Sequence, residues 1–149
     1  MSTRFLVDTD VLSVGAPSKA RAVRELVEWM DRHSERLYVS VVTIAEIEDG
    51  IAKSKRAGAT RKAAQLREWL ETLAHLYTPR ILPFDLAAAR IAGVLSDEAR
   101  GRGHTAGFAD LAIGAAARCH ALTILTRNLE HYAPLGVAAL DPVAALPPE

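Results

Sequence analysis

Two carboxylates stand one residue apart near the start of the chain, directly after a short apolar run. The run is Phe5-Leu6-Val7, and Asp8-Thr9-Asp10 follows it at once. A carboxylate at the end of a buried strand must be hydrogen-bonded, protonated or bound to a cation, because removing its charge from water is costly. Asp8 needs such a partner, whereas Asp10 can instead cap a short helix over 11–14.

A second acidic candidate is Glu46, in the segment VVTIAEIEDGI. Helical spacing places it roughly opposite an isoleucine face, which favours a solvated side chain. Thr43 and Glu46 also have the spacing of a capping box at a helix start. Glu48 and Asp49 are neighbouring acids, and periodicity does not choose among the three.

A third acidic candidate is Asp110, in HTAGFADLAIGAAARCH. It falls in the first turn of a predicted helix, where the positive end of the helix dipole favours an anion. A surface acid stabilised in this way is one interpretation. However, Gly114 and Ala117 share its face and lack bulk, so we expect another backbone to approach the carboxylate closely.

Convergence of Asp8, Glu46 and Asp110 would require a cation. Two carboxylates about 4 Å apart repel by roughly 4 kcal/mol at an effective dielectric constant of about 20. A divalent ion relieves this repulsion, and oxygen ligands suit Mg²⁺ or Mn²⁺. Zinc is disfavoured because Cys119 is the single cysteine and no histidine pair has ligand spacing. Such an acidic site is typical of metal-dependent phosphodiester hydrolysis.

The elements that must position these acids alternate between strand and helix. Patterning predicts strands at 4–7, 37–42, 80–83, 121–125 and 137–140, and helices at 18–33, 43–55, 60–77, 86–100 and 106–119, with a helical turn at 129–132. This alternation predicts an α/β fold, a sandwich in which helices flank a mainly parallel central sheet. Function in such sheets gathers at the carboxyl ends of the strands. Asp8 lies at one such end, and Thr126 and Asn128 follow the strand at 121–125.

Length and composition fit one domain over residues 1–149 with a sizeable core. The lone cysteine predicts a reducing compartment. Acidic residues occupy the position where a signal peptide needs an apolar segment, and no apolar run is long enough to span a membrane. We expect a cytoplasmic protein with no membrane association.

The net charge is zero, but its distribution is uneven. Six basic residues and no acid lie between residues 53 and 67, which leaves 12 basic and 18 acidic residues elsewhere. The segment is either a solvated helix face or a contact surface for phosphates. Its members are Lys53, Lys55, Arg56, Arg61, Lys62 and Arg67.

Four segments, taken in order, resemble the signature segments of a known family. They are FLVDTDVLS, SVVTIAEIEDGI, AGFADLAIGAAA and LTILTRNLEHY. The chain is similar in these segments to PIN-domain ribonucleases, and specifically to the VapC/FitB-type toxins of bacterial type II toxin–antitoxin pairs. The resemblance covers nearly the whole chain, including the ending VAALDP, and it implies a PIN-like three-layer sandwich.

The resemblance implies that Asp8, Glu46 and Asp110 are the catalytic metal ligands, and it thereby selects Glu46 over its neighbours. The family often has a fourth acid at the position of Asn128, so this chain departs from the pattern there. The lost charge leaves open whether one metal ion or two are bound. Supporting polar roles are implied for Thr9, Asp10 and Thr126, with Asn128 beside them.

By the same resemblance, the activity is Mg²⁺- or Mn²⁺-dependent endonucleolytic cleavage of RNA. Flanking positive charge must then hold the RNA backbone against an acidic pocket. A homodimer bound to a cognate antitoxin is the implied assembly, with the helices at 43–55 and 60–77 as contact surfaces. Candidate phosphate contacts are Lys53, Lys55, Arg56, Arg61, Lys62 and Arg102, the last in the loop at 100–104.

Two alternatives remain. A haloacid-dehalogenase-type phosphatase also begins with a strand ending in Asp-x-Asp, with the first Asp as nucleophile. That pattern continues with Thr or Val two residues after the second Asp, where this chain has Leu12, and a late pair of adjacent acids is missing. The other alternative is a catalytically silent PIN-like binding module, which the change at Asn128 keeps open.

Overall fold

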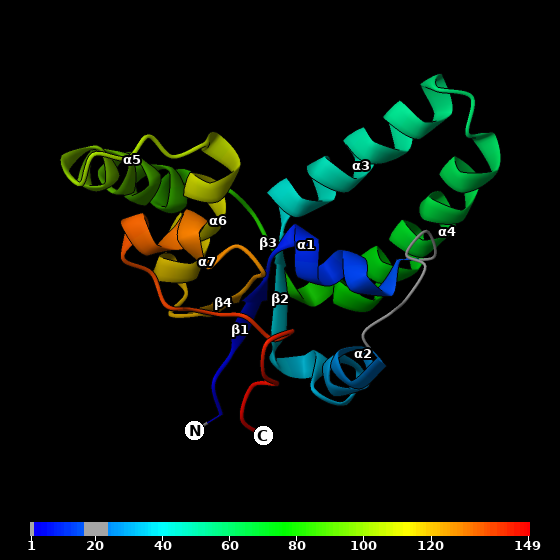
Figure 1. The fold of residues 1–149 in the computed structure, drawn as a ribbon, viewed down its shortest axis with the longest axis horizontal. Coiled ribbons are helices and arrows are strands. Elements are labelled where there is room, and N and C mark those ends of the chain that lie inside the picture. The colour runs from blue at the N-terminus through cyan, green and yellow to red at the C-terminus, as the bar shows by residue number, and fades with distance from the viewer. Residues whose placement is uncertain (1, 17–23) are drawn as a thin grey trace.

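A parallel sheet forms the centre of the protein (Figure 1), seen in a computed structural model that describes residues 2–16 and 24–149. The described strands run in the order β3-β2-β1-β4-β5, and every pairing is parallel. The strands are β1 Phe5–Val7, β2 Leu37–Ser40, β3 Ile81–Leu82, β4 Thr123–Leu125 and β5 Ala139–Leu140. The predicted α/β sandwich with a parallel sheet is confirmed.

Helices cover both faces of this sheet. They are α1 Thr9–Leu12, α2 Arg24–Arg32, α3 Val41–Arg56, α4 Thr60–Tyr77, α5 Leu86–Gly101, α6 Phe108–Cys119 and α7 Leu129–Tyr132. In Figure 1, α5, α6 and α7 lie on one side of the sheet and α1 to α4 on the other. The start of the predicted helix at 18–33 falls outside the described residues. No described helix has the length and apolar character needed to cross a membrane.

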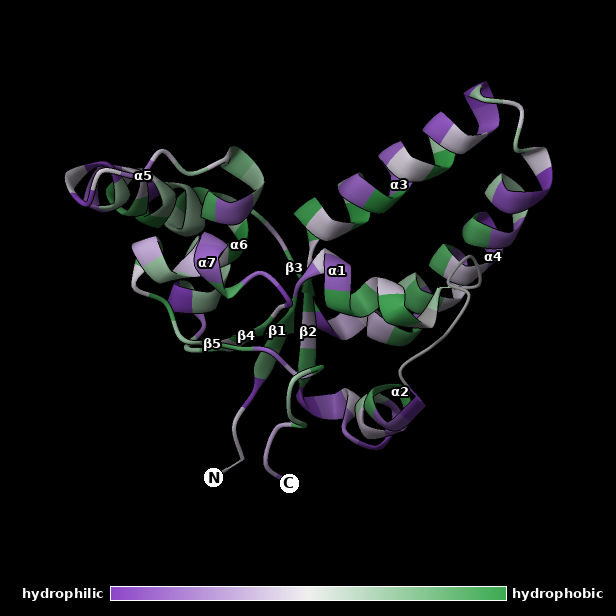
Figure 2. Cartoon of the chain, in the orientation of Figure 1, coloured by the Kyte–Doolittle hydropathy of each residue, from purple (hydrophilic) through white to green (hydrophobic). Residues whose placement is uncertain are grey.

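Two hydrophobic cores follow from the alternation of side chains along β1. Phe5 and Val7 point into a core with Leu26, Trp29 and other residues of α1 to α4. Leu6 points to the opposite face, into a core built by α5, α6 and α7. Both faces of β1 are buried, which explains why its sequence is a continuous apolar run. Figure 2 shows strands at the centre of the sheet largely in green, the colour of hydrophobic residues.

Predicted boundaries that fall on described residues agree with the structure within two residues, but the predicted cap of α3 is wrong. Helix α3 begins at Val41, and Ser40 caps it by accepting a hydrogen bond from the Val42 amide at 3.0 Å. The predicted cap at Thr43, with Glu46 as its capping-box partner, is therefore wrong. Thr43 lies inside the helix, fully buried, and its hydroxyl bonds to Thr9 instead. Asp85 caps α5 by accepting a hydrogen bond from the Ala88 amide.

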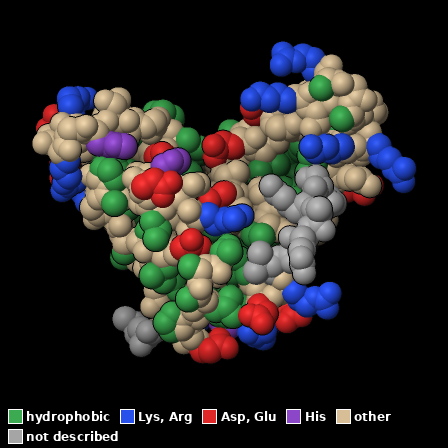
Figure 3. All heavy atoms as spheres, viewed as in Figure 1, with side chains coloured by type: hydrophobic (Ala, Val, Ile, Leu, Met, Phe, Trp, Pro, Cys, Tyr) green, Lys and Arg blue, Asp and Glu red, His purple; other side chains and the backbone are tan. Residues whose placement is uncertain are grey.

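Helices α3 and α4 form a hairpin that extends away from the sheet beyond its carboxyl edge (Figure 1). The space-filling view shows a notch between this hairpin and the side formed by α5, α6 and α7 (Figure 3). Acidic and histidine side chains gather at the foot of the notch, and basic side chains gather on the far end of the hairpin. The carboxyl ends of the strands therefore lie at a recess whose floor is acidic and one of whose walls carries basic side chains.

Candidate active site

Asp8 is the most firmly held acid at the carboxyl edge of the sheet. It follows β1, is 8% exposed, and its backbone amide bonds to the Leu125 carbonyl of β4. One carboxylate oxygen accepts from the Thr9 amide at 2.8 Å, and the other accepts from the Thr126 hydroxyl at 2.9 Å. Thr126 is fully buried at the end of β4. Two neighbouring strand ends thus fix the orientation of this carboxylate.

Asp10 has a different position from the one predicted. Asp8 is the residue that caps α1, so the prediction that Asp10 caps a helix over 11–14 is wrong. Asp10 Oδ2 instead accepts from the Arg127 amide and from the Asn128 side-chain amide, both at 3.0 Å. Burial and the charge of Asp8 raise the pKa of the Asp10 carboxyl, and the Arg127 amide opposes this rise. Asp10 therefore connects the first turn of α1 to the loop after β4.

Glu46 reaches the same region from α3. Its Oε1 lies 2.5 Å from Thr9 Oγ1, which also lies 3.0 Å from Thr43 Oγ1. Because a carboxylate only accepts, Thr9 donates to Glu46 and Thr43 donates to Thr9. The neighbouring acids have basic partners elsewhere on the hairpin, Glu48 with Arg67 and Asp49 with Lys53. The structure therefore distinguishes Glu46 from the two acids that periodicity could not exclude.

Asp110 lies in the first turn of α6, as predicted. Its Oδ2 is 3.4 Å from His131 Nδ1 of α7. Burial raises the pKa of the Asp110 carboxyl, His131 opposes the rise, and the charge of Asp8 adds to it. No neighbouring backbone approaches at Gly114: a Cβ there would meet the Leu135 and Leu95 side chains, at 3.1 and 3.7 Å. The small face of α6 therefore accommodates side chains of the second core.

Tyr132 is a member of this site that the sequence did not single out. It is fully buried in α7, and its hydroxyl makes no hydrogen bond of ordinary geometry with any described residue. Burial, together with the charges of Asp8 and Asp110, raises the pKa of this hydroxyl. The phenol therefore stays neutral beside two carboxylates and keeps the proton that it can donate in a hydrogen bond.

His131 and Thr43 were also missed. Both follow from tertiary packing, since His131 meets Asp110 only through the contact of α7 with α6. A sequence signal was present for His131 and Tyr132, because the predicted helical turn at 129–132 directly follows Asn128 at the end of a strand. For Thr43 the capping signal pointed to a different role.

The donor set suits a hard divalent cation. Asp8, Asp10, Glu46 and Asp110 form no ion pair with a lysine or arginine of the described chain. Asp10 Oδ1 is buried and, within residues 2–16 and 24–149, also has no hydrogen-bond partner. In the same part of the chain, no three His, Cys, Asp or Glu side chains stand together as a complete metal cluster. Donor chemistry and charge thus fit Mg²⁺ or Mn²⁺, and the ligand set stays a prediction.

The predicted phosphate contacts divide into paired and unpaired cations. Lys53 pairs with Asp49 at 3.1 Å, and Arg67 pairs with Glu48 and Glu71. Arg102 donates to the Pro134 carbonyl, which ties the end of α5 to the turn after α7. Four cations on the hairpin form no ion pair with a described residue: Lys55, Arg56, Arg61 and Lys62.

Comparison with known proteins gives consistent matches along the chain. The PIN domain family matches residues 5–133. The VapC ribonuclease Y4jK of Sinorhizobium fredii is 35% identical over 139 residues, covering 93% of this chain and 96% of that protein. Toxin FitB of Neisseria gonorrhoeae is 33% identical over 140 residues, covering 93% and 97%.

Solved structures agree with the sequence matches. The crystal structure of FitAcB from Neisseria gonorrhoeae superposes with a TM-score of 0.81 at 33% identity, over 93% of this chain and 97% of that one. VapBC2 from Rickettsia felis, bound to a promoter DNA fragment, has a TM-score of 0.74 at 18% identity, over 93% and 98%. At that lower identity the likeness concerns the fold alone.

Proposed function

We propose a reaction for this chain from one premise: it belongs to the PIN-domain family, among the VapC/FitB toxins of toxin–antitoxin systems. The proposed reaction is Mg²⁺- or Mn²⁺-dependent endonucleolytic hydrolysis of RNA phosphodiester bonds. The observation that carries it is the buried Asp8 carboxylate, held by Thr9 and Thr126 at the sheet edge with Asp110 and Glu46 around it.

Asp8, Glu46 and Asp110 are the proposed metal ligands. A bound divalent ion would supply Lewis acidity at the scissile phosphate and offset the developing negative charge. The protein's own contribution is orientation: the Thr126 hydroxyl holds Asp8, and the Thr9 hydroxyl holds Glu46. Such supporting contacts typically change metal affinity or activity by about 10- to 100-fold when they are removed.

Asp10 and Asn128 hold the loop after β4 against α1. Asn128 uses its side-chain nitrogen on Asp10, and its backbone amide donates to the Thr126 hydroxyl at 3.0 Å. Asn128 thus supports Thr126, which in turn holds Asp8. We assign both residues this supporting role, with no formal charge contributed by Asn128.

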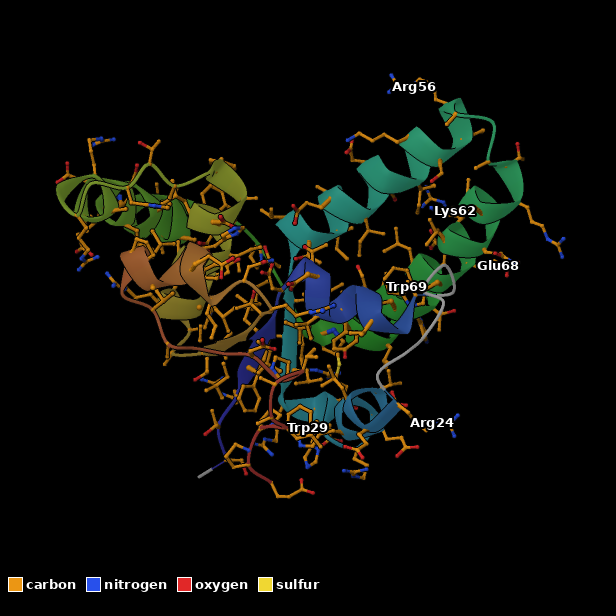
Figure 4. All side chains as sticks on the ribbon, viewed as in Figure 1. Arg24, Trp29, Arg56, Lys62, Glu68 and Trp69 are labelled. Carbon is orange, nitrogen blue, oxygen red and sulfur yellow. The ribbon has the colours of Figure 1, made fainter. Side chains whose placement is uncertain are left out.

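The basic end of the hairpin supports RNA as the substrate. Lys55, Arg56, Arg61 and Lys62 carry unpaired charge at the far side of the notch from the acids (Figure 4 labels Arg56 and Lys62). A polyanion crossing the notch would gain from these charges while its scissile phosphate approaches the acidic floor. We include Lys53 and Arg102 as weaker contacts, since each already has a partner in the protein.

The proposal includes a protein partner. The similar structures are FitAB and VapBC assemblies, several with bound DNA. We propose that this chain likewise pairs with a cognate antitoxin, forms a homodimer, and acts in the cytoplasm. Co-expression with the protein of the neighbouring gene, followed by co-purification and mass measurement of the complex, tests the partner and the stoichiometry together.

The decisive experiment measures RNA cleavage by the purified chain and three variants. Asp8→Asn, Asp110→Asn and Glu46→Gln each remove one proposed ligand charge with little change in shape. We expect cleavage by the wild type in Mg²⁺ or Mn²⁺, its loss in EDTA, and at least a 100-fold loss in each variant. Asp97→Asn is the matched control, because Asp97 is an exposed acid on α5 whose one ion pair with a described residue is with Arg100.

Two outcomes would contradict the proposal. Full RNA cleavage by Asp8→Asn and Asp110→Asn would show that the ligand assignment is wrong. Turnover of p-nitrophenyl phosphate without RNA cleavage would instead indicate a phosphatase.

A further inference from the structure

A cavity of about 240 Å³ lies beside Glu46, between α1 with its following turn, α3 and α4. Thr9 and Glu46 are among its lining residues, so it borders the proposed cleavage site. Ser13 and Ser54 also line it. Its volume is below the about 300–1,000 Å³ of pockets that enclose drug-sized ligands, and it therefore suits a single ring system.

One face of α4 forms the outer wall of this cavity. Lys62, Leu66 and Trp69 all line it, and their spacing of four and three residues places them on the same helix face. Trp69 is half-buried, packs against the first core, and lines both this cavity and a neighbouring one that is also lined by Leu73 and Tyr77. Figure 4 shows Trp69 nearer to α1 and Lys62 nearer to the turn between α3 and α4.

The opposite wall is kept open by a glycine. Gly50 lies inside α3 and lines the cavity, and a Cβ placed on it would meet no heavy atom within 4 Å. Its backbone is helical, so a side chain can be added without backbone strain. A larger residue at position 50 would therefore project into free space in the cavity.

We propose that this cavity binds one nucleotide of a single-stranded RNA, next to the bond that is cleaved. The base stacks on the Trp69 indole, and Lys62 contacts the adjoining phosphate. This inference rests on the proposed ribonuclease function and assigns that site a subsite for its substrate. Trp69 and Lys62 become substrate-binding contacts, whereas Gly50 provides the room.

The chemistry of the lining favours a nucleotide. Aromatic side chains that border an open pocket stack on unpaired bases, and a lysine without an ion pair is suited to one phosphate. Ser13 and Ser54 carry hydroxyls that can hydrogen-bond to a base edge or a ribose hydroxyl. The lining therefore offers a partner for each part of a nucleotide: Trp69 for the base, hydroxyl groups for the ribose and Lys62 for the phosphate.

The binding experiment uses the Asp110→Asn protein in EDTA, so that it requires no catalysis. The probe is an eight-nucleotide single-stranded RNA of mixed sequence, labelled for fluorescence anisotropy. We expect Trp69→Ala and Gly50→Leu each to weaken binding about 10-fold or more, as the loss of one stacked base predicts. Trp69→Phe, which keeps a stacking ring, and Gly50→Ala are the matched controls and should remain within about threefold.

Tryptophan fluorescence gives a second readout. The chain has two tryptophans, and Trp29 is buried in the first core, so stacking on Trp69 should quench the intensity as RNA is added. Trp69→Phe should abolish the quenching while it preserves the anisotropy change.

For the phosphate contact, Lys62→Gln should reduce the slope of log affinity against log salt by about 0.7, whereas exposed Arg90→Gln should leave it unchanged.

Unchanged RNA affinity in both Trp69→Ala and Gly50→Leu, at wild-type thermal stability, would overturn the proposal. The proposal would also be overturned if these variants bound the antitoxin more weakly but bound RNA normally, since the cavity would then receive a protein segment. If Trp69→Ala fails to fold, Gly50→Leu decides the question, because it removes no core contact. Weakened RNA binding together with no RNA cleavage by wild type would retain the subsite and reject the ribonuclease function.

Discussion

At the scale of single residues, Asp8 shows how a buried carboxylate is kept in place. Each of its oxygens accepts one hydrogen bond, from the Thr9 amide and from the Thr126 hydroxyl. Both donors come from the backbone segments that leave two adjacent strands, so their positions are fixed by the sheet. Thr126 also accepts from the Asn128 amide, which makes its hydroxyl the centre of a short chain of bonds.

Replacing Thr126 by Val should therefore destabilise the protein. Valine preserves the shape but leaves a buried Asp8 oxygen without its donor, which typically costs about 1–3 kcal/mol. Urea denaturation at pH 7 measures the change. Thr105→Val is the control, because Thr105 is exposed and its hydroxyl makes no recorded hydrogen bond with the described residues. Equal stability of the two variants would contradict the role of this hydroxyl.

At the scale of elements, surface ion pairs join the two helices of the hairpin. Arg67 of α4 contacts Glu48 of α3 through both of its terminal nitrogens, at 2.5 and 2.8 Å, and Glu71 lies one turn further along α4. The Arg67 guanidinium lowers the pKa of the Glu48 carboxyl. This pair also neutralises Arg67, one of the six basic residues of the segment at 53–67, so the unpaired positive charge of the segment lies nearer the end of the hairpin.

The pair predicts a pH-dependent effect of Glu48→Gln. A carboxyl whose pKa is lower in the folded protein than in the unfolded chain adds stability above its unfolded pKa, near 4.5. We therefore expect a small decrease in thermal midpoint at pH 7, which disappears as the pH falls through the lowered pKa. Thermal unfolding of both proteins between pH 3 and 7 tests this. High salt should reduce the difference at pH 7.

Helix α6 depends on a close contact at Gly114. A Cβ there would lie 3.1 Å from Leu135 Cδ1 and 3.7 Å from Leu95 Cδ1. Gly114→Val should overpack the second core and cost about 1–3 kcal/mol in unfolding free energy. Gly93→Val on α5 is the matched control, since a Cβ at Gly93 meets nothing within 4 Å. Comparable stability of the two variants in urea would show that Leu135 simply moves aside.

At the scale of the whole molecule, the acids come from both sides of the sheet. Glu46 belongs to the side with α1 to α4, Asp110 to the side with α5 to α7, and Asp8 to the central strand. Their like charges oppose the approach of the two sides at the notch. A cation bound among them would connect the two halves of the protein and stabilise the folded state.

Addition of Mn²⁺ to the metal-free protein should therefore raise its thermal midpoint, and EDTA should reverse the change. Binding to the folded state alone contributes about 2.7 kcal/mol at a concentration about 100 times the dissociation constant. Asp8→Asn should lose most of this shift, and Asp97→Asn should keep it. An equal shift in the two variants would place the ion elsewhere.

The sequence by itself determined the fold class, the order of the elements and the three acids worth testing. Buried strands and amphipathic helices carry this information locally, because apolar periodicity follows from which faces leave water. Tertiary structure decided the contacts of each acid. The packing of α3 against α1 brings Glu46, which the family resemblance selects, to Thr9, whereas Glu48 and Asp49 pair with basic residues. The contact of α7 with α6 brings His131 to Asp110. Such contacts join residues distant in sequence, for which local patterning holds no physical signal.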